Sequence, residues 1–366
     1  MQLVAYGAQD IYLTGNPQIT FFKVVYRRHT NFAVESIEQT YNGTVGNGNK
    51  VSVTVSRNGD LLHRVWLRVT SAAVQNATAG FGAIDYVECE IGGQVIDKQY
   101  GDWMALWCDL THNADQHEML KKLADKTATT TGAGHEVVGH LPLQFWFCRN
   151  PGLALPLIAL QYHEVKLNIA FADQGSTLGP TALSVFCDYI FLDTDERRRF
   201  AQVSHEYLIE QTQFSNVLSA GKADTTNNVN KQVELRFNHP VKELVWTIED
   251  PTDNTPANLV DALLQLNGHD RFKRREGAYF TGVQRYQHHS GSNNTFASST
   301  PAVYSFALKP EEHQPSGTCN FSRIDNAVLN INWQHAGQNA HNLRVYAVNY
   351  NVLRVMSGMG GLAYSN

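Results

Sequence analysis

The tetrapeptide Ile37–Glu38–Gln39–Thr40 occurs again as Ile209–Glu210–Gln211–Thr212. An alternating stretch follows each copy, with valine at 51, 53 and 55 after the first and apolar residues at 233, 235 and 237 after the second. A Val–Trp pair comes next in each half, at 65–66 and at 245–246. A repeat of roughly 170–180 residues is longer than solenoid periods, so we interpret the chain as one domain fold present twice.

The composition favours a globular protein of two domains. The chain has 366 residues, of which 43% are hydrophobic and 17% are charged. That length exceeds the size at which a single core usually stops growing. The net charge of −5 provides no basic surface for wrapping nucleic acid, so we expect no direct nucleic-acid binding.

Cysteine spacing and the N-terminus indicate the compartment. The five cysteines are widely spaced and form no CxxC pair, which predicts a reducing environment without a disulfide framework. Residues 1–10 lack a charged region followed by an apolar stretch, so no signal peptide is predicted. The most apolar short run, 153–160, is far below membrane-spanning length. We therefore expect a soluble intracellular protein.

Alternating apolar and polar residues predict many short strands. Asn58–Gly59 predicts a turn that joins strands 51–55 and 65–69 into a hairpin. Glycine-containing turns at 91–94 and 266–269 mark matching points in the two halves. Such strands with Gly, Pro and Asn turns are typical of an all-β sandwich or barrel, here repeated once. The other predicted strands cover residues 87–95, 143–147, 165–171, 184–192, 233–237, 244–248, 261–266, 303–308, 327–333 and 343–355.

Two helices are expected in the first half. Asp102 is the candidate N-cap of a helix in which Trp103, Leu106, Trp107 and Leu110 share one apolar face. The second helix is predicted from residue 115 to about 123. The aromatic stripe admits a ligand-binding interpretation, but packing across a sandwich edge is the more common role. Exposed loops are predicted at 126–134, 216–230 and 288–300, which are rich in small and polar residues.

The two halves meet at residues 193–200. This charged stretch contains neither glycine nor proline, so it predicts an ordered turn or helix rather than a flexible tether. A short, stiff join would hold the two sandwiches in one relative orientation. That property suits a building block better than a pair of independent binding modules.

No catalytic, cofactor-binding or metal-binding residues are predicted. His112 with His117, and His135 with His140, are each five residues apart, a spacing that puts the two side chains of a pair on different helix or strand faces. His288–His289 is adjacent and lies in a segment predicted to be a polar loop, unlike the metal-binding strand of a cupin. The HExxH, GxSxG and P-loop motifs are absent from the sequence.

Long and uncommon strings along the chain carry a family resemblance. The N-terminal strings Tyr6–Asp10, Tyr12–Lys23 and Val25–Ala33 closely resemble the signature of the major capsid proteins of nucleocytoplasmic large DNA viruses. The resemblance extends from end to end and implies a double jelly roll: two tandem antiparallel eight-stranded jelly-roll sandwiches, all-β, with short helices in the loops. Further strings similar to that family lie at Arg57–Asp60, Asp193–Gln211, Gln314–Asp325, Asn349–Arg354 and Ser357–Tyr364.

This resemblance implies a structural capsid protein that performs no catalysis and uses no cofactor. Three copies would form a pseudo-hexagonal homotrimeric capsomer, and neighbouring capsomers would tile the icosahedral shell of a virion assembled in the host cytoplasm. We divide the chain into an N-terminal arm, residues 1–23, a first jelly roll, 24–198, and a second jelly roll, 199–366. The arm would lie at the base, toward minor capsid proteins and the internal viral membrane; packing on its own domain is the alternative.

Other functions stay open on the sequence alone. A minor capsid paralogue would share the same strings of residues. A lectin-like, carbohydrate-binding sandwich would use exposed loop aromatics such as Tyr279, Phe280 and Tyr286. Glycosidase chemistry also stays open, because acidic residues such as those at 85, 88 and 90 cannot be paired across the fold from sequence.

Overall fold

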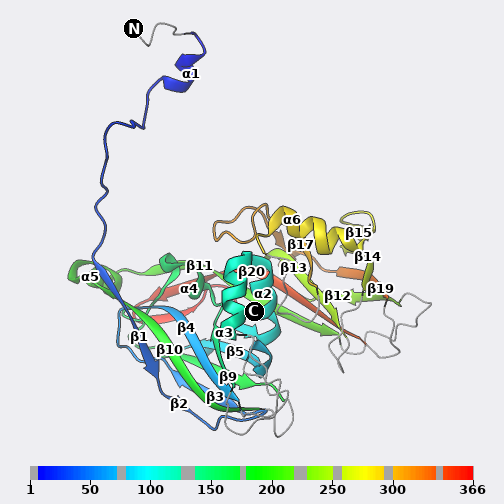
Figure 1. Cartoon of the computed structure of the whole chain (residues 1–366), viewed down its shortest axis with the longest axis horizontal. Helices are drawn as coiled ribbons and strands as arrows, with labels where there is room; N and C mark the ends of the chain where they lie inside the picture. Colours follow the sequence, from blue (N-terminus) through cyan, green and yellow to red (C-terminus); the bar gives the residue numbers. More distant parts are fainter. Residues whose placement is uncertain are drawn as a thin grey trace.

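The computed structural model describes residues 7–71, 80–124, 137–173, 179–217, 229–249, 258–291, 300–334 and 341–365. Two β-sandwiches lie next to each other, with the helix α2 (Gly101–Thr111) of the first sandwich between them (Figure 1). The predicted loop 126–134 lies outside the described residues. So do 218–228 and 292–299, which make up most of the other two predicted loops.

The first sandwich consists of two antiparallel sheets with the strand order of a jelly roll. One sheet has the order β1 (Phe32–Gln39), β10 (Pro180–Leu192), β4 (Leu61–Ser71) and β7 (Val137–Pro142), with β8 (Leu155–Pro156) beside β4. The facing sheet has the order β2 (Tyr41–Asn42), β3 (Lys50–Thr54), β9 (Val165–Phe171), β5 (Ile84–Ile91) and β6 (Gln94–Tyr100).

The second sandwich repeats this order, so the predicted double jelly roll is confirmed. One sheet has the order β11 (His205–Val217), β20 (Asn342–Met356), β13 (Pro240–Glu249) and β17 (Ala302–Ser305), with β18 (Cys319–Asn320) beside β13 and β21 (Met359–Leu362) beside β20. The facing sheet has the order β12 (Val229–Glu234), β19 (Ala327–Gln334), β14 (Asn258–Leu266) and β15 (His269–Asp270), with β16 (Arg275–Glu276) beside β14.

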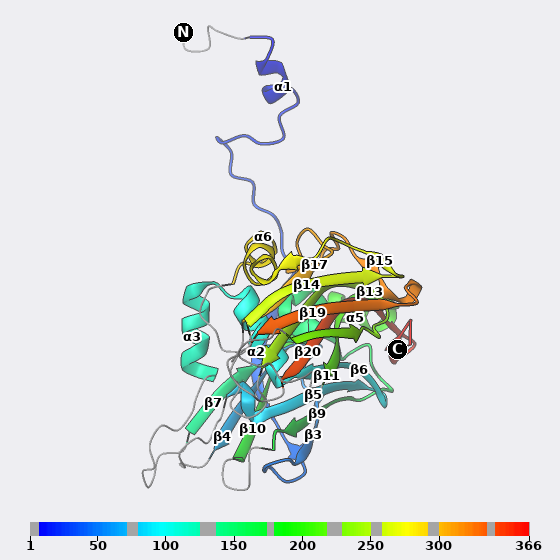
Figure 2. The ribbon, with the colours of Figure 1, turned by 90° about the vertical axis from the view of Figure 1, so that its right-hand side faces the viewer.

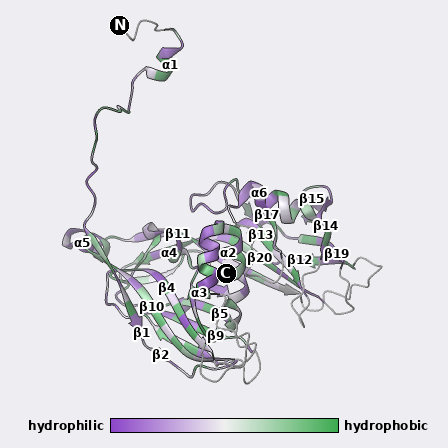
Figure 3. Ribbon diagram, in the orientation of Figure 1, coloured by the Kyte–Doolittle hydropathy of each residue, from purple (hydrophilic) through white to green (hydrophobic). Residues whose placement is uncertain are grey.

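Each sandwich has its own apolar core. Along β3, Val51 and Val53 are buried while the residues between and beside them are more exposed, the period of a strand with one face on a core. Figure 3 shows hydrophobic and hydrophilic stretches alternating along neighbouring strands such as β4 and β10. Val65, Leu67 and Val69 of β4 are buried in the same core from the facing sheet. The second core is built in the same way around Trp246 and Trp333 and many aliphatic side chains.

The repeated sequence marks equivalent strands, but not equivalent faces. The second tetrapeptide copy lies within β11, and the first three residues of the first copy are the end of β1. Trp246 is fully buried in the second core, whereas Trp66 is half-buried on the outer face of its sheet. Because successive strand residues point to opposite faces, the two Val–Trp pairs differ by one step in register.

The predicted hairpin of strands 51–55 and 65–69 is wrong. β3 and β4 belong to different sheets, so the turn at Asn58–Gly59 carries the chain across the sandwich. A Cβ added at Gly59 would lie 2.6 Å from the Cβ of Tyr189, so glycine serves close packing there. The other two predicted turns are confirmed: Gly92–Gly93 and Asn267–Gly268 all have positive φ, as a two-residue hairpin turn requires.

The strand predicted at 143–147 is also wrong. Residues 146–149 form the short helix α4 (Trp146–Arg149), and Phe145, Trp146 and Phe147 are all buried. Their rings pack on one another, with Phe145 and Phe147 stacked at 5.6 Å between centroids. A short run that is apolar on every side does not distinguish a strand from a buried helix.

Both predicted helices are confirmed, as α2 (Gly101–Thr111) and α3 (Ala114–Ala124). Tyr100, not Asp102, is the N-cap residue of α2. Figure 2 shows α3 on the flank of the molecule, next to β7.

The join between the sandwiches is ordered, as predicted. It forms helix α5 (Thr194–Gln202), whose N-cap residue Asp193 accepts a hydrogen bond from the backbone N–H of Thr194 at 2.7 Å. Arg197 of α5 pairs with Asp60 of the first sandwich at 2.9 Å. The helix is therefore tied to the body of the first sandwich.

The N-terminal segment extends away from both sandwiches (Figures 1 and 2). All residues from 7 to 31 are exposed except Asp10, which is half-buried. The segment contains the five-residue helix α1 (Asp10–Thr14), and the chain first enters a sheet at Phe32. Within the described residues, every helix is too short or too polar to traverse a lipid bilayer.

Candidate functional site: the joint between the two sandwiches

The aromatic stripe of α2 packs on the second sandwich. The prediction that this helix crosses a sandwich edge is wrong, because its side chains lie on the outer face of sheet β11-β20-β13-β17. A stripe that is apolar at every helical turn needs a broad apolar partner, and a sheet face supplies one. The contact joins Trp103, Leu106, Trp107 and Leu110 of α2 to Val245, Val303, Tyr346 and Val348.

Residues of β11 and β20 in the second sandwich also pack in the core of the first. Ile209 of β11 and Leu353 and Val355 of β20 are buried in the first core. Beside them, the backbone N–H of Thr212 donates to Oδ1 of Asp97 at 3.1 Å. Burial raises the pKa of the Asp97 carboxyl, while hydrogen bonds from Gln99 and Thr212 act against that rise. The core of the first sandwich thus extends across the joint onto two strands of the second.

A buried ion cluster lies around Glu210. Its carboxylate oxygens lie 2.8 Å from Nζ of Lys242 and 2.8 Å from an Nη of Arg149, and Nδ1 of His313 is 3.7 Å away. The guanidinium of Arg149, which belongs to the first sandwich, lies 3.9 Å above the ring of Trp107. Burial alone would raise the pKa of Glu210, but Lys242, His313 and Arg149 outweigh it and lower that pKa to about 2.

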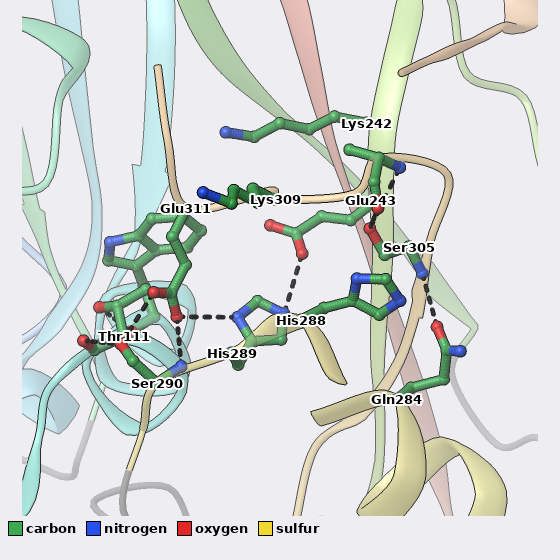
Figure 4. A network of polar contacts seen from close by, with 12 residues as sticks. Thr111, Lys242, Glu243, Gln284, His288, His289, Ser290, Ser305, Lys309 and Glu311 are labelled. Atoms are coloured by element: carbon green, nitrogen blue, oxygen red, sulfur yellow. Dashed lines mark hydrogen bonds and ion pairs between the residues drawn. The ribbon is translucent and has the colours of Figure 1, made fainter. Parts of the chain in front are cut away.

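A second ion cluster centres on His289 (Figure 4). Nε2 lies 3.1 Å from Glu243 and Nδ1 lies 3.2 Å from Glu311, so both ring nitrogens face carboxylates. Burial opposes the charged ring, yet the two carboxylates prevail and raise the pKa of His289 to about 9. Ser290 connects this cluster to the first sandwich, because its hydroxyl donates to the carbonyl of Thr111 at 3.0 Å.

A third contact fixes the start of α2. Arg344 of β20 forms ion pairs with Asp102 of α2 and with Glu249 of β13. Burial raises the pKa of the Glu249 carboxyl, and Arg344 partly offsets that rise. The helix is therefore held to the second sandwich at its first turn by charge, along its length by apolar packing and at its end through Ser290.

The histidines that were considered as metal ligands lie in several different parts of the structure. His117 contacts Asp109 at 2.9 Å in the core near α2 and α3, and His140 lies half-buried on β7. His135 lies outside the described residues. His288 is the last residue of α6, and His289 follows that helix with its side chain only 1% exposed, so the prediction of an exposed loop at 288–300 is wrong at its start. Over the described ranges, no three His, Cys, Asp or Glu side chains form a group that could hold a metal ion.

The aromatic set proposed for carbohydrate binding is not an exposed loop cluster. Tyr279 and Phe280 lie in the π-helix η3 (Tyr279–Val283), and Tyr286 lies in α6 (Gln284–His288). Phe280 is fully buried in the second core and Tyr279 is half-buried. Only Tyr286 of the three is exposed, at 90%. The sequence could not show which of the three side chains is exposed, because the π-helical turn of η3 interrupts the α-helical periodicity there.

Comparison with known proteins assigns the family. Residues 20–208 match the family described as major capsid protein N-terminus, and residues 196–361 match the large eukaryotic DNA virus major capsid protein family. The chain belongs to the major capsid proteins of large eukaryotic DNA viruses. It is thus a member of a family of structural proteins of the virion shell.

Relatives in this family match along their whole length. The chain is 54% identical to the major capsid protein of Pyramimonas orientalis virus, over 100% of this chain and 99% of the relative. It is 45% identical to the major capsid protein of Paramecium bursaria Chlorella virus 1, with the same coverage. A chain in the quasi-atomic structure of the PBCV-1 virus capsid superposes with a TM-score of 0.86 at 42% identity, covering 95% of this chain and 100% of that one.

Proposed function

We propose that three copies of this chain form a homotrimeric capsomer of pseudo-hexagonal outline, and that such capsomers tile an icosahedral shell without any catalytic activity. Two sandwiches of the same topology within one chain support this proposal. Closed threefold symmetry turns them into a ring of six similar units, which approaches the outline of a hexagon.

The joint is the observation that carries the proposal. Domains within a chain usually move relative to one another unless their interface is large and apolar. Here the interface combines the buried α2 stripe, the part of the first core that includes residues of β11 and β20, and two ion clusters. A fixed angle between the sandwiches lets each chain serve as one third of a ring.

The trimer is tested by mass in solution. Light scattering on a size-exclusion column should give about 123 kDa, three times the chain mass of 40.9 kDa. A mass of one chain at micromolar concentration would contradict the proposal. Electron microscopy of the same sample should show particles with a six-sided outline.

The N-terminal arm would lie at the base of the capsomer and bind minor capsid proteins near the internal membrane. Its apolar side chains support this role: Phe21 is 92% exposed and Phe22 is 98% exposed. Exposed apolar clusters usually mark interaction sites. We place assembly in the host cytoplasm, where the free state of all five cysteines would be maintained.

The division into arm, first jelly roll and second jelly roll also remains a proposal. Residues 24–31 lie outside both sheets, so the arm would extend to residue 31, beyond the boundary at 23. The boundary between residues 198 and 199 falls inside α5. We infer that this helix acts as a rigid join and belongs equally to both jelly rolls.

A further inference from the structure

The first strands of the two sandwiches can be aligned, because the same hydrogen-bond contact occurs once in each sandwich. Oε1 of Gln39 accepts the backbone N–H of Ser56 at 3.0 Å, and Oε1 of Gln213 accepts the backbone N–H of Asn238 at 2.9 Å. Each accepting glutamine thus holds the turn that precedes the third main strand of its own sandwich. Gln39 is therefore equivalent to Gln213, two residues beyond the glutamine of the repeated tetrapeptide.

This alignment matches the outer faces of the two sheets. In the second sandwich one row of paired residues on that face is Phe214, Tyr346, Val245 and Val303. A row on the same face of the first sandwich is Glu38, Phe186, Trp66 and Pro142, and its Glu38 aligns with Thr212, two residues before Phe214.

The two rows differ in what covers them. Tyr346, Val245 and Val303 are fully buried because α2 lies on them. Phe186, Trp66 and Pro142 are only half-buried, and Glu38 is exposed. The first sandwich therefore presents an aromatic sheet face that is only partly covered, with α3 beside its edge strand β7.

The helices of the two sandwiches are equivalent as well. A Cβ added at Gly101 would collide with the carbonyl of Ile84 at the start of β5, and one added at Gly277 would collide with the carbonyl of Leu259 at the start of β14. Each glycine thus brings a helix against the same point of the same strand. The helical segment of η3 and α6 is therefore the counterpart of α2.

Counting from these two glycines identifies the matching stripe. Trp103, Leu106, Trp107 and Leu110 correspond to Tyr279, Gly282, Val283 and Tyr286. The first stripe is buried against the second sandwich. Of the second set, Tyr279 is half-buried against the second core, whereas Val283 is 44% exposed and Tyr286 is 90% exposed. One chain thus carries a partly covered sheet face and a helix whose Val283 and Tyr286 are exposed, each the counterpart of a half of the joint.

We propose that the η3–α6 stripe of one copy docks on the outer face of sheet β1-β10-β4-β7 of the next copy, over Phe186 and Trp66. This inference rests on the proposed trimer, because each copy of a closed ring offers its helix to one neighbour and its sheet to the other. The contact between chains then repeats the contact within the chain. Six equivalent joints would close the ring.

The surroundings of the sheet face fit such an occupant. A groove of about 850 Å³ opens beside the row and is lined by Trp66 and Pro142 on one side. Its other side is formed by Met119 and Leu123 of α3, which are 66% and 43% exposed. Exposed apolar side chains on both walls favour a protein surface as the occupant.

Tyr286→Asp tests the proposal directly. The side chain is exposed in the single chain, so the substitution leaves the fold intact, while a carboxylate placed on an aromatic face opposes docking. We expect trimer affinity measured by light scattering to fall by about ten-fold or more. Tyr162→Asp, at a tyrosine that is 76% exposed elsewhere, should keep the trimer mass.

Photo-crosslinking identifies the partner surface. A benzophenone side chain at position 286 should yield covalent dimers whose linked peptides come from β4 or β10 of another chain. A monomeric wild-type protein would overturn the trimer itself. A trimeric wild type whose Tyr286→Asp variant stays trimeric, or whose crosslinks fall on other strands, would overturn only the docking of this stripe.

Discussion

Arg149 of the first sandwich and Glu210 of the second form an ion pair across the joint, with 2.8 Å between an Nη and Oε2. Their side chains are 18% and 8% exposed, so water screens the pair weakly. The same guanidinium stacks over Trp107, the residue with which α2 reaches the second sandwich. Charge and apolar packing therefore meet at one side chain, and this explains how a short join can fix two large domains.

Arg149→Met should weaken the joint. Removing one partner leaves a buried carboxylate with less compensation, so we expect the free energy of unfolding to fall by about 2–4 kcal/mol in urea titrations. Arg354→Met is the matched control, because Arg354 pairs with Glu206 at 2.8 Å but both side chains are more than half exposed. The control should change stability by about 0.5 kcal/mol or less. Equal effects of the two substitutions would contradict the role given to Arg149.

His289 should make the joint sensitive to alkaline pH. Its pKa is raised to about 9 in the folded chain, so its stabilisation is complete below the unfolded value of 6.5 and is lost as the pH rises through 9. The wild type should lose about 3 kcal/mol relative to His289→Gln over that range. Urea unfolding of both proteins at a series of pH values measures the difference. Parallel curves between pH 6.5 and 9.5 would refute this assignment.

Glu210 should act at the opposite end of the pH scale. Its pKa is lowered to about 2, so its stabilisation is present above the unfolded value of 4.5 and is lost as the pH falls through 2. Glu210→Gln should be less stable at pH 6, because Lys242 is then buried without its carboxylate. Thermal unfolding should show this difference narrowing as the pH falls from 4.5 toward 2. A gap that widens in acid would be inconsistent with the ion cluster.

Deletion of residues 1–20 should leave trimers intact and block shell assembly. Residues 7–23 of the arm belong to neither buried core, so neither the fold nor the number of chains per particle should change. Shell formation with the minor capsid proteins can be followed by electron microscopy. A full-length variant with Phe21→Ser and Phe22→Ser tests the apolar side chains at unchanged arm length. Loss of the trimer in the deletion would show that the arm serves trimer contacts instead.

Gly101→Ala should destabilise the chain although alanine is the better helix former. Its Cβ would collide with the carbonyls of Ile84 and Phe81, so the helix must shift and the free energy of unfolding should fall by about 1–3 kcal/mol. Gly282→Ala is the control, because an added Cβ there meets nothing within 4 Å. The control should be neutral or stabilising by about 0.5–1 kcal/mol. Thermal unfolding of the two variants, measured in parallel, tests this difference. Equal stability of the two variants would contradict it.

Local patterns in the sequence were sufficient for strands with one polar face, for tight turns and for a helix that carries an apolar stripe. The alternation at Val51 and Val53, the α2 stripe and the positive-φ turns at Gly92 and Asn267 follow from single-residue geometry. The run 143–147 was mispredicted because a segment buried on every side shows no period. The prediction of a β3–β4 hairpin was wrong because a turn signal does not show whether the next strand pairs in the same sheet or crosses to the facing one.

The amino-acid sequence by itself determined that one sandwich fold occurs twice and that the join is stiff. Alternation, turns and the repeated segments can all be recognised from residues that are close together in the sequence. Only the tertiary structure decided which helix or sheet face packs on which other face. Glu210 with Arg149, and His289 with Glu243 and Glu311, are partners far apart in sequence whose pairing depends on how whole sheets stack. Local periodicity carries no information on such pairings, because it sets the direction of a side chain and not the element that it meets.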